Sequence, residues 1–502
     1  MKESLCLQEN NGPYYILVAL VITALVCFFS TGISGNDFWW HVKAGEWMVA
    51  NRSLPTVDVF SWYAKENNIV WSSHEWLSQV FLHLVHDLGG DAGIFLFSLF
   101  SAIAMAMLIM VKNKEAIKSN ILLSTLFLVP MVMQIKIMFF GRPHLISFFL
   151  IYATLHCLYK LKDDEDSRLV YFVPLLAILW SNLHGGSSTL SYILCFIFLG
   201  SGCIGVSFGK LEGERFSRKQ LYKYAAAGVL SIAALAVNPY GIDMLIYPYA
   251  NMGDEFMQKM IIEWSSPDAK VIAQLLFFHF PLLMAGITLI ITDKKIRLLD
   301  LMVFVFFAYM FLRSMRFVFV FYMSFSFYIF NYLLPARQVS RTTNRSLEKV
   351  VCSAVAVILL IINLWGIANS FKTATEGKLI SVALSSTFIE FIKKETPARL
   401  FNEYDFGETL VYNGIETFVD ARADLFSPHN LRDYRSLSLL KHVGADKNDS
   451  IFDPEMLIAK YAFDAFIIRP NSTLSAYLNT KPEKYQILAQ DEGAVYFKRI
   501  GL

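Results

Sequence analysis

The 502-residue chain is 55% hydrophobic and 15% aromatic, and only 17% of its residues are charged. Soluble domains carry roughly a quarter charged residues, so this composition excludes an ordinary soluble protein and predicts a polytopic membrane protein. The formal net charge of +2 gives no argument for nucleic-acid binding, and the six cysteines have no metal-ligand spacing.

Apolar runs of membrane-spanning length follow one another along the chain as far as residue 369. About eleven are expected, at 14–34, 91–111, 119–139, 144–160, 169–183, 186–207, 223–238, 271–292, 298–312, 316–335 and 350–369. Lysines and arginines gather in the loops after the second, sixth, eighth and tenth runs, which share one side of the membrane. The positive-inside rule therefore predicts a multi-pass protein of the cell membrane with a cytoplasmic N-terminus.

The first outer loop, residues 35–90, directly follows the first span and carries six of the nine tryptophans. Indole rings prefer the level of the lipid headgroups. The loop ends in a helical pattern from Glu75 to His86, in which positions 77, 80, 81, 84 and 85 form one apolar stripe. A helix of this kind is expected to lie in the membrane interface, which points to a site that works on a lipid-borne substrate.

The candidate catalytic residues are Asp37, His74 and Glu75. Asp37 is expected to act as a general base or as a metal-binding carboxylate at the membrane face, with helix capping as the structural alternative. His74 and Glu75 either bind sugar hydroxyls or a divalent ion, or form a polar face turned to water. These residues do not define a metal site, so no cofactor is predicted and the need for a divalent metal stays open.

A second group of candidates lies at other span ends that this topology places outside. The residues expected to bind the phosphate of a donor are Arg142, His144, His184, Arg313 and Arg316. The planar guanidinium suits phosphate oxygens, although arginines at span ends also reach toward lipid headgroups. Trp39, Trp40 and Trp264 are candidates for stacking on a sugar ring or on the donor lipid, with an interfacial anchor as the alternative for Trp264.

From about residue 370 the composition changes. Short β-type runs at 409–412, 417–420, 465–468 and 494–497 alternate with helical stretches at 380–395 and 430–442. The chain is therefore expected to be mainly α-helical, with a transmembrane module at 1–369 and a small α/β domain at 370–502 on the extracytoplasmic side. Within that domain, Asp420, Arg422 and Asp424 are expected to form a structural ion-pair turn.

Several of these features together resemble the GT-C superfamily, the polytopic glycosyltransferases that use polyprenyl-phosphate-linked sugars. The shared features are an acidic residue just after the first span, interfacial helices in the first outer loop and about eleven spans. More closely, the chain resembles a largely uncharacterised bacterial membrane-protein family in the segments 37–41, 45–47, 55–61, 74–76, 142–144, 182–185 and 420–424. Distant relatives in the superfamily include protein O-mannosyltransferases and aminoarabinose transferases, but the mannosyltransferases have adjacent Asp and Glu where this chain has Asp37 and Phe38.

The resemblance implies transfer of a sugar from a polyprenyl-phosphate-linked donor to a glycan, lipid or protein acceptor on the outer face, with Asp37 as the base. Three alternatives remain open. One is a polymerase or ligase of lipid-linked glycans, which is close in chemistry but would have its working arginines and histidine in a later outer loop. A transporter or flippase of lipid-linked glycans would show charged residues at mid-span and repeated broken helices, and neither is evident in the sequence. A non-catalytic scaffold of envelope assembly would share the fold and lack the activity.

Overall fold

The computed structural model describes residues 11–30, 37–138, 141–252, 256, 261–333, 345–376, 384–427, 429–443 and 452–501. The chain divides into two compact units, each built from segments that are far apart in sequence. Unit 1 contains residues 1–33, 89–248 and 262–379, and unit 2 contains residues 34–88, 249–261 and 380–502.

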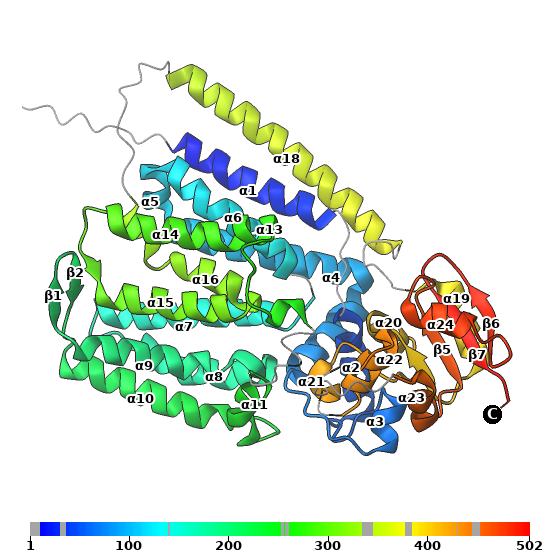
Figure 1. The fold of residues 1–502 in the computed structure, drawn as a ribbon. Helices are drawn as coiled ribbons and strands as arrows, with labels where there is room; N and C mark the ends of the chain where they lie inside the picture. The colour runs from blue at the N-terminus through cyan, green and yellow to red at the C-terminus, as the bar shows by residue number, and fades with distance from the viewer. Residues whose placement is uncertain are drawn as a thin grey trace, which may run out of the picture. The chain divides into compact units, whose positions relative to one another are not determined.

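Unit 1 is almost entirely helical (Figure 1). Its α-helices are α1 (Gly12–Ser30), α5 (Lys114–Ser119), α6 (Ile121–Met138), α7 (His144–Asp163), α8 (Phe172–Leu183), α9 (Leu190–Cys203), α10 (Arg218–Leu235), α13 (Ile272–Gln274), α14 (Phe280–Ile291), α15 (Leu298–Arg313), α16 (Val318–Phe325), α17 (Ile329–Tyr332) and α18 (Arg345–Thr375). Short turns join them: the 3₁₀ segments η1 (Leu169–Tyr171), η2 (Gly185–Ser187), η3 (Ile262–Trp264) and η5 (Met315–Phe317), and the π-helical η4 (Leu275–His279). Two helices, α4 (Trp76–Lys112) and α11 (Asp243–Met252), contribute residues to both units.

Within the described ranges, six helical segments are long and apolar enough to cross a membrane: Gly12–Ser30, Trp76–Lys112, His144–Asp163, Gly185–Cys203, Ile272–Ile291 and Ser353–Thr375. Shorter apolar helices lie at Ile121–Ile135, Leu169–Leu183 and Met315–Phe325. The protein is thus a mainly helical membrane protein, while the number of eleven spans stays a prediction. The long α18 runs alongside α1 (Figure 1), and much of its remaining surface is apolar and exposed, as expected for a helix that faces lipid.

A small three-stranded sheet joins two loops of unit 1. Its strands are β1 (Val206–Phe208), β2 (Leu211–Gly213) and β3 (Ile296–Arg297), with β1 antiparallel and β3 parallel to β2. The following α10 begins with a capping box, in which the Ser217 hydroxyl accepts from the Gln220 N–H and the Gln220 side chain accepts from the Ser217 N–H. These contacts satisfy backbone groups that the helix end leaves open.

Unit 2 contains a four-stranded mixed sheet with helices around it. The strands β4 (Leu400–Asn402), β5 (Ala465–Ile468), β6 (Tyr485–Gln490) and β7 (Val495–Arg499) are ordered β4-β5-β7-β6, and only the β4–β5 pair is parallel. The helical segments are α2 (Phe38–Asn51), α3 (Trp62–Glu66), α19 (Ser386–Glu395), η6 (Tyr404–Phe406), α20 (Gly407–Tyr412), α21 (Ala423–Phe426), α22 (Leu431–Leu439), α23 (Pro454–Tyr461) and α24 (Thr473–Asn479). Leu384, Phe388, Ile392, Leu400, Ile467 and Tyr496 form part of its core.

Two of the four predicted strands are present and two are not. The runs at 465–468 and 494–497 correspond to β5 and β7, whereas residues 409–412 are helical in α20 and Thr417 forms only an isolated bridge with Ser61. Thr409, Leu410 and Val411 are all buried. A short run that is buried on every side has no periodicity that separates a strand from a helical turn, so the strand prediction at 409–412 was wrong.

The first loop is part of the fold of unit 2 and hydrogen-bonds to its C-terminal segment. The Ser61 hydroxyl donates to the Thr417 carbonyl at 2.7 Å, and the Trp62 indole N–H donates to the Leu400 carbonyl at 3.0 Å. The Trp62 ring stacks on Phe418 with ring centroids 5.6 Å apart. Residues 34–88 and 380–502 therefore share one core.

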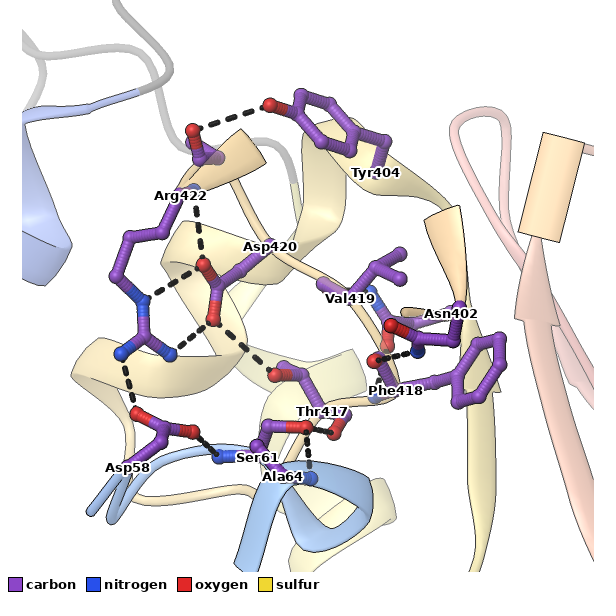
Figure 2. Close-up of polar contacts among 12 residues, drawn as sticks. Asp58, Ser61, Ala64, Asn402, Tyr404, Thr417, Phe418, Val419, Asp420 and Arg422 are labelled. Carbon is purple, nitrogen blue, oxygen red and sulfur yellow. Dashed lines mark hydrogen bonds and ion pairs between the residues drawn. The ribbon is translucent and has the colours of Figure 1, made fainter. Parts of the chain in front are cut away.

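A buried ion triad joins the same two segments (Figure 2). The Arg422 guanidinium donates to Asp420 through Nε at 2.9 Å and Nη2 at 2.6 Å, and its Nη1 contacts Asp58. All three side chains are at most 1% exposed. Burial alone would lower the pKa of Arg422, but the charges of Asp420 and Asp58 raise it above its ordinary value, so the guanidinium stays charged.

Candidate functional site

Asp37 occupies the N-cap position of α2 in unit 2, but its side chain makes no capping hydrogen bond. The carboxylate that serves this helix end comes from Glu408 of α20, whose Oε2 accepts the backbone N–H of Trp39 at 3.3 Å. Glu408 is 4% exposed, so this hydrogen bond to the positive end of the helix is shielded from water. Asp37 thus takes the N-cap position without a side-chain capping hydrogen bond, and Glu408 supplies a carboxylate oxygen at the same helix end.

A buried phenol lies within electrostatic reach of Asp37. Burial raises the pKa of Tyr404 well above its ordinary value, and the charge of Asp37 raises it further, together with those of Asp420 and Asp424. The Tyr404 hydroxyl therefore stays protonated and donates to the Ala421 carbonyl at 3.0 Å (Figure 2). Acidic side chains of the first loop and of segment 420–424 thus influence the same hydroxyl.

His74 and Glu75 belong to a polar cluster in unit 2 that also contains His41. The two Glu75 oxygens lie 3.6 Å from His41 Nε2 and 3.6 Å from His74 Nε2, so the carboxylate bridges two imidazoles. His41 Nδ1 lies 3.4 Å from the side-chain nitrogen of Gln79, whose oxygen accepts from the Ser73 hydroxyl at 2.6 Å. Glu75 is only 6% exposed, which contradicts the alternative that it belongs to a water-facing polar surface.

The first turns of α4 bury Ser78 and Gln79 and leave part of the apolar stripe exposed. Ser78 and Gln79 are at most 1% exposed, whereas Phe81 is 38% and Leu84 is 45% exposed. The polar side packs against α2, where a Cβ added to Gly45 would lie 2.1 Å from the Gln79 carbonyl oxygen. Only glycine allows this approach, and the apolar stripe is thereby left on the outside, as an interfacial helix requires.

The three tryptophans expected to stack on a ligand differ in accessibility. Trp39 is 5% and Trp40 is 7% exposed, and both rings pack against protein groups of unit 2. Trp39 lies 4.4 Å from the Tyr412 ring, and Trp40 lies 3.7 Å from the His41 ring. Trp264 in unit 1 is half-buried and is the most accessible of the three.

In unit 1, Arg142 contacts the Glu263 carboxylate, and Arg316 packs on the neighbouring Trp264. Arg142 Nη1 lies 3.1 Å and 3.4 Å from the two oxygens of Glu263, and the Arg316 guanidinium lies 5.4 Å from the centre of the Trp264 ring. Burial raises the pKa of Glu263, but the charges of Arg142 and Arg316 and the Arg142 hydrogen bond outweigh it and lower the pKa below its ordinary value. The cluster therefore contains two positive charges and one negative charge beside an indole ring, which favours anions.

Two short turns carry this cluster. Glu263 and Trp264 lie on η3, and Arg316 lies on η5. The turns are joined by the Ser314 hydroxyl, which donates to the Glu263 carbonyl at 3.0 Å, and by the Met315 N–H, which donates to the Ser265 carbonyl at 3.0 Å. Arg313, the last residue of α15, is exposed, and its carbonyl accepts from Ser266 at 3.4 Å.

His144 and His184 lie close together in unit 1, with ring centroids 6.3 Å apart. His184 is 5% exposed, and its Nδ1 lies 2.6 Å from the Ser147 hydroxyl and 2.8 Å from the Ser187 hydroxyl. The Trp180 indole N–H donates to the Ser147 oxygen at 2.8 Å. This network fixes the His184 ring in one orientation.

Sequence reasoning did not identify several of these partners. The pairing of Glu263 with Arg142 cannot be predicted from the sequence, because nothing local links two residues that are 121 positions apart. The sequence also gives no sign that Ser147, Ser187 and Trp180 surround His184, because serines and tryptophans are common in apolar helices. The residues that the structure describes contain no group of three histidine, cysteine, aspartate or glutamate side chains arranged to hold a metal ion.

No protein-family model and no curated protein matches this chain. Several solved structures match it. The oligosaccharyltransferase of Archaeoglobus fulgidus, tethered to an acceptor peptide, aligns over 97% of this chain and 74% of its own length, with 11% identity and a TM-score of 0.50. ArnT from Cupriavidus metallidurans in the apo state aligns over 97% of this chain and 98% of its own length, with 12% identity and a TM-score of 0.50.

Both proteins are glycosyltransferases of the GT-C type. At such low identity the likeness concerns the fold, and it confirms at that level the resemblance seen in the sequence. The chain therefore has the fold of the GT-C superfamily of membrane glycosyltransferases.

Proposed function

We propose that the protein transfers a sugar from a polyprenyl-phosphate-linked donor to an acceptor on the extracytoplasmic face of the cell membrane. The acceptor is a glycan, a lipid or a protein of the cell envelope. The observation that carries the proposal is the cluster of Arg142, paired with Glu263, and Arg316, packed on Trp264, in a chain with the fold of membrane glycosyltransferases. Function still has to be argued from these side chains, because a fold alone supports many activities.

The reaction has one proton transfer and one substitution. Asp37 accepts the proton of the acceptor hydroxyl, and the hydroxyl oxygen attacks the anomeric carbon of the donor sugar. The bond between that carbon and the phosphate oxygen breaks, and the lipid phosphate leaves with the electron pair. A positioned general base contributes about 10²–10⁴ in rate.

The leaving phosphate needs positive charge rather than a proton donor. Arg142 and Arg316 supply it in this proposal, with His144, His184 and Arg313 as further donors. One such electrostatic contact is worth about 10²–10³ in rate. Trp264 stacks on the sugar or on the first lipid units, as do Trp39 and Trp40 if their rings become accessible. His74 and Glu75 orient the acceptor, and Glu75 is the next candidate for the base.

The test is sugar transfer by the purified full-length protein in lipid nanodiscs. Labelled polyprenyl-phosphate sugars are offered with a cell-envelope extract as acceptor, and wild type is compared with Asp37→Asn. The matched control is Asp87→Asn, which removes an exposed carboxylate from the same loop. Loss of transfer in Asp37→Asn alone supports the proposal.

Equal transfer by Asp37→Asn and wild type would assign the base to another residue, and Glu75→Gln would be tested next. Absence of transfer from every donor would favour a transporter, flippase or scaffold. Movement of a labelled lipid-linked glycan between bilayer leaflets then separates the transporter from the scaffold.

A further inference from the structure

Glu263 occupies the place on Arg142 that an anionic ligand needs. Its two oxygens both contact the single nitrogen Nη1 of Arg142, at 3.1 and 3.4 Å. The strongest carboxylate–arginine pairs are bidentate, with two guanidinium nitrogens each taking one oxygen, and this contact has a different geometry. The Glu263 side chain is also 41% exposed, whereas that of Arg142 is 16% exposed. The more accessible partner of the pair is the carboxylate.

We propose that Glu263 is a built-in substitute for the donor phosphate, which displaces its carboxylate from Arg142 when the donor binds. This inference rests on the proposed function and adds a step to it. Between turnovers the carboxylate contacts Arg142, while the Arg316 guanidinium, whose charge also acts on Glu263, packs on the Trp264 ring. When the donor arrives, the phosphate oxygens replace the carboxylate oxygens as acceptors.

The charges favour a lipid phosphodiester as the group that replaces Glu263. The carboxylate is ionised near neutral pH because the two arginines lower its pKa. A sugar linked to a lipid through one phosphate is a phosphodiester with one negative charge, the same as the carboxylate. The exchange therefore leaves the net charge around the arginines unchanged, whereas a diphosphate would bring additional negative charge.

The local structure allows Glu263 to move without unfolding its surroundings. The contact that ties Glu263 to η5 uses its backbone carbonyl, which accepts from the Ser314 hydroxyl at 3.0 Å. The neighbouring backbone contact between Met315 and Ser265 likewise involves no part of the Glu263 side chain. A change of side-chain rotamer can thus release the guanidinium while η3 and η5 stay joined.

The two possible roles of Glu263 predict opposite results for one substitution. If the carboxylate competes with the ligand, Glu263→Gln binds a phosphate more tightly than wild type, by about three- to fivefold, as expected for a partly exposed ion pair. If the carboxylate instead orients Arg142 for the ligand, the same substitution weakens binding. Because Gln has the shape of Glu, the fold is preserved, and a thermal melt verifies this.

The experiment measures binding of farnesyl methyl phosphate, a lipid phosphodiester with one negative charge, to the full-length protein in phosphatidylcholine nanodiscs by isothermal titration calorimetry, with farnesol as the uncharged control ligand. Asp268→Asn is the matched variant, because it removes an exposed carboxylate from the same loop. The Asp268 carboxylate accepts a hydrogen bond from the backbone N–H of Lys270 and, within the described residues, contacts no arginine in the cluster. Tighter binding by Glu263→Gln, unchanged binding by Asp268→Asn and loss of binding by Arg142→Gln are the expected results.

Two results would overturn the inference while leaving the phosphate-binding role of Arg142 intact. One is weaker or unchanged binding by Glu263→Gln, and the other is equal tightening by Asp268→Asn, which would indicate a general effect of loop charge. If Arg142→Gln binds the ligand as tightly as wild type does, Arg142 is not part of a phosphate-binding site, and the proposed function loses its main support. If phosphatidylglycerol added to the nanodiscs competes as well as unlabelled farnesyl methyl phosphate, the ligand is a membrane headgroup and the donor assignment is wrong.

Discussion

Replacement of Arg422 by Gln tests whether the buried ion triad holds unit 2 together. The substitution removes three hydrogen-bonded contacts to Asp58 and Asp420 and leaves two buried carboxylates without their counter-charge. The guanidinium also lies 4.7 Å from the centre of the Trp71 ring and 5.3 Å from that of Phe60, so the variant loses favourable contacts with aromatic rings as well.

The expected loss of stability is large. Summing charge-assisted hydrogen bonds of about 1.5–3 kcal/mol each would overestimate it, because the contacts share one side chain. Removal of one partner from a buried ion pair costs about 3–5 kcal/mol, because a buried charge is left uncompensated. For a unit of this size, 1 kcal/mol corresponds to about 2–4 °C, so the melting temperature of unit 2 should fall by roughly 6–20 °C.

Arg399→Gln is the matched control. Arg399 also joins the C-terminal segment to the first loop, through an ion pair with Glu66 at 3.1 Å, but the two side chains are 39% and 48% exposed. Exposed pairs of this kind contribute about 0–1 kcal/mol. The assay is thermal unfolding of the detergent-solubilised protein, followed by tryptophan fluorescence, since Trp40 and Trp71 surround the triad.

A melting temperature of Arg422→Gln within about 2 °C of Arg399→Gln would refute the reasoning, since it would mean that burial adds nothing to the ion pair. If Arg422→Gln does not fold, Arg422→Lys provides the test. It keeps the charge and loses the planar fork, and should melt between wild type and the level expected for Arg422→Gln.

Two further predictions concern packing and pH. Gly45→Ala should destabilise the protein by about 1–3 kcal/mol, because its Cβ would lie 2.1 Å from the Gln79 carbonyl oxygen. The control Gly89→Ala should melt like wild type, because a Cβ there meets nothing within 4 Å. Equal melting temperatures of the two variants would contradict the close approach of α2 and α4. Burial raises the pKa of Glu455, but hydrogen bonds from Lys481, Tyr477 and Tyr485 outweigh it and lower the pKa below the usual 4.5. The ionised Glu455 therefore stabilises the fold above pH 4.5, and this stabilisation is lost as the pH falls through the lowered pKa. Between pH 5 and pH 3 the melting temperature of wild type should fall more than that of Glu455→Gln. Equal decreases in the two melting temperatures would contradict the prediction.

The helical membrane module could be predicted because long apolar runs have few other structures open to them. The strand β5 could also be predicted, because the run at 465–468 is rich in aromatic and β-branched residues and is bounded by polar residues. The short buried helix α20 could not be predicted, because its apolar residues carry no periodicity. For the first part of α4, the period was read correctly, but the sequence did not show that the polar side would face Gly45 and the interior.

The candidate site divides in the same way. Asp37, Arg142 and Arg316 could be singled out because ionisable residues at the ends of apolar runs are uncommon. Glu263 and Glu408 could not be, because their partners lie far away in the sequence, and only the folded chain brings the charges together. Which residues act in a reaction stays a prediction for all of them.

The discontinuous construction of unit 2 has a consequence for biosynthesis. Asp58 and Arg422 are 364 residues apart, and at about 5–20 residues per second the ribosome needs on the order of a minute to make the second after the first. Throughout that interval the first loop exists without the arginine that neutralises its buried carboxylate and without the carbonyls that accept from Ser61 and Trp62. Its folding must therefore follow membrane insertion, and a chain truncated before β4 would leave residues 34–88 as an unfolded substrate for proteases.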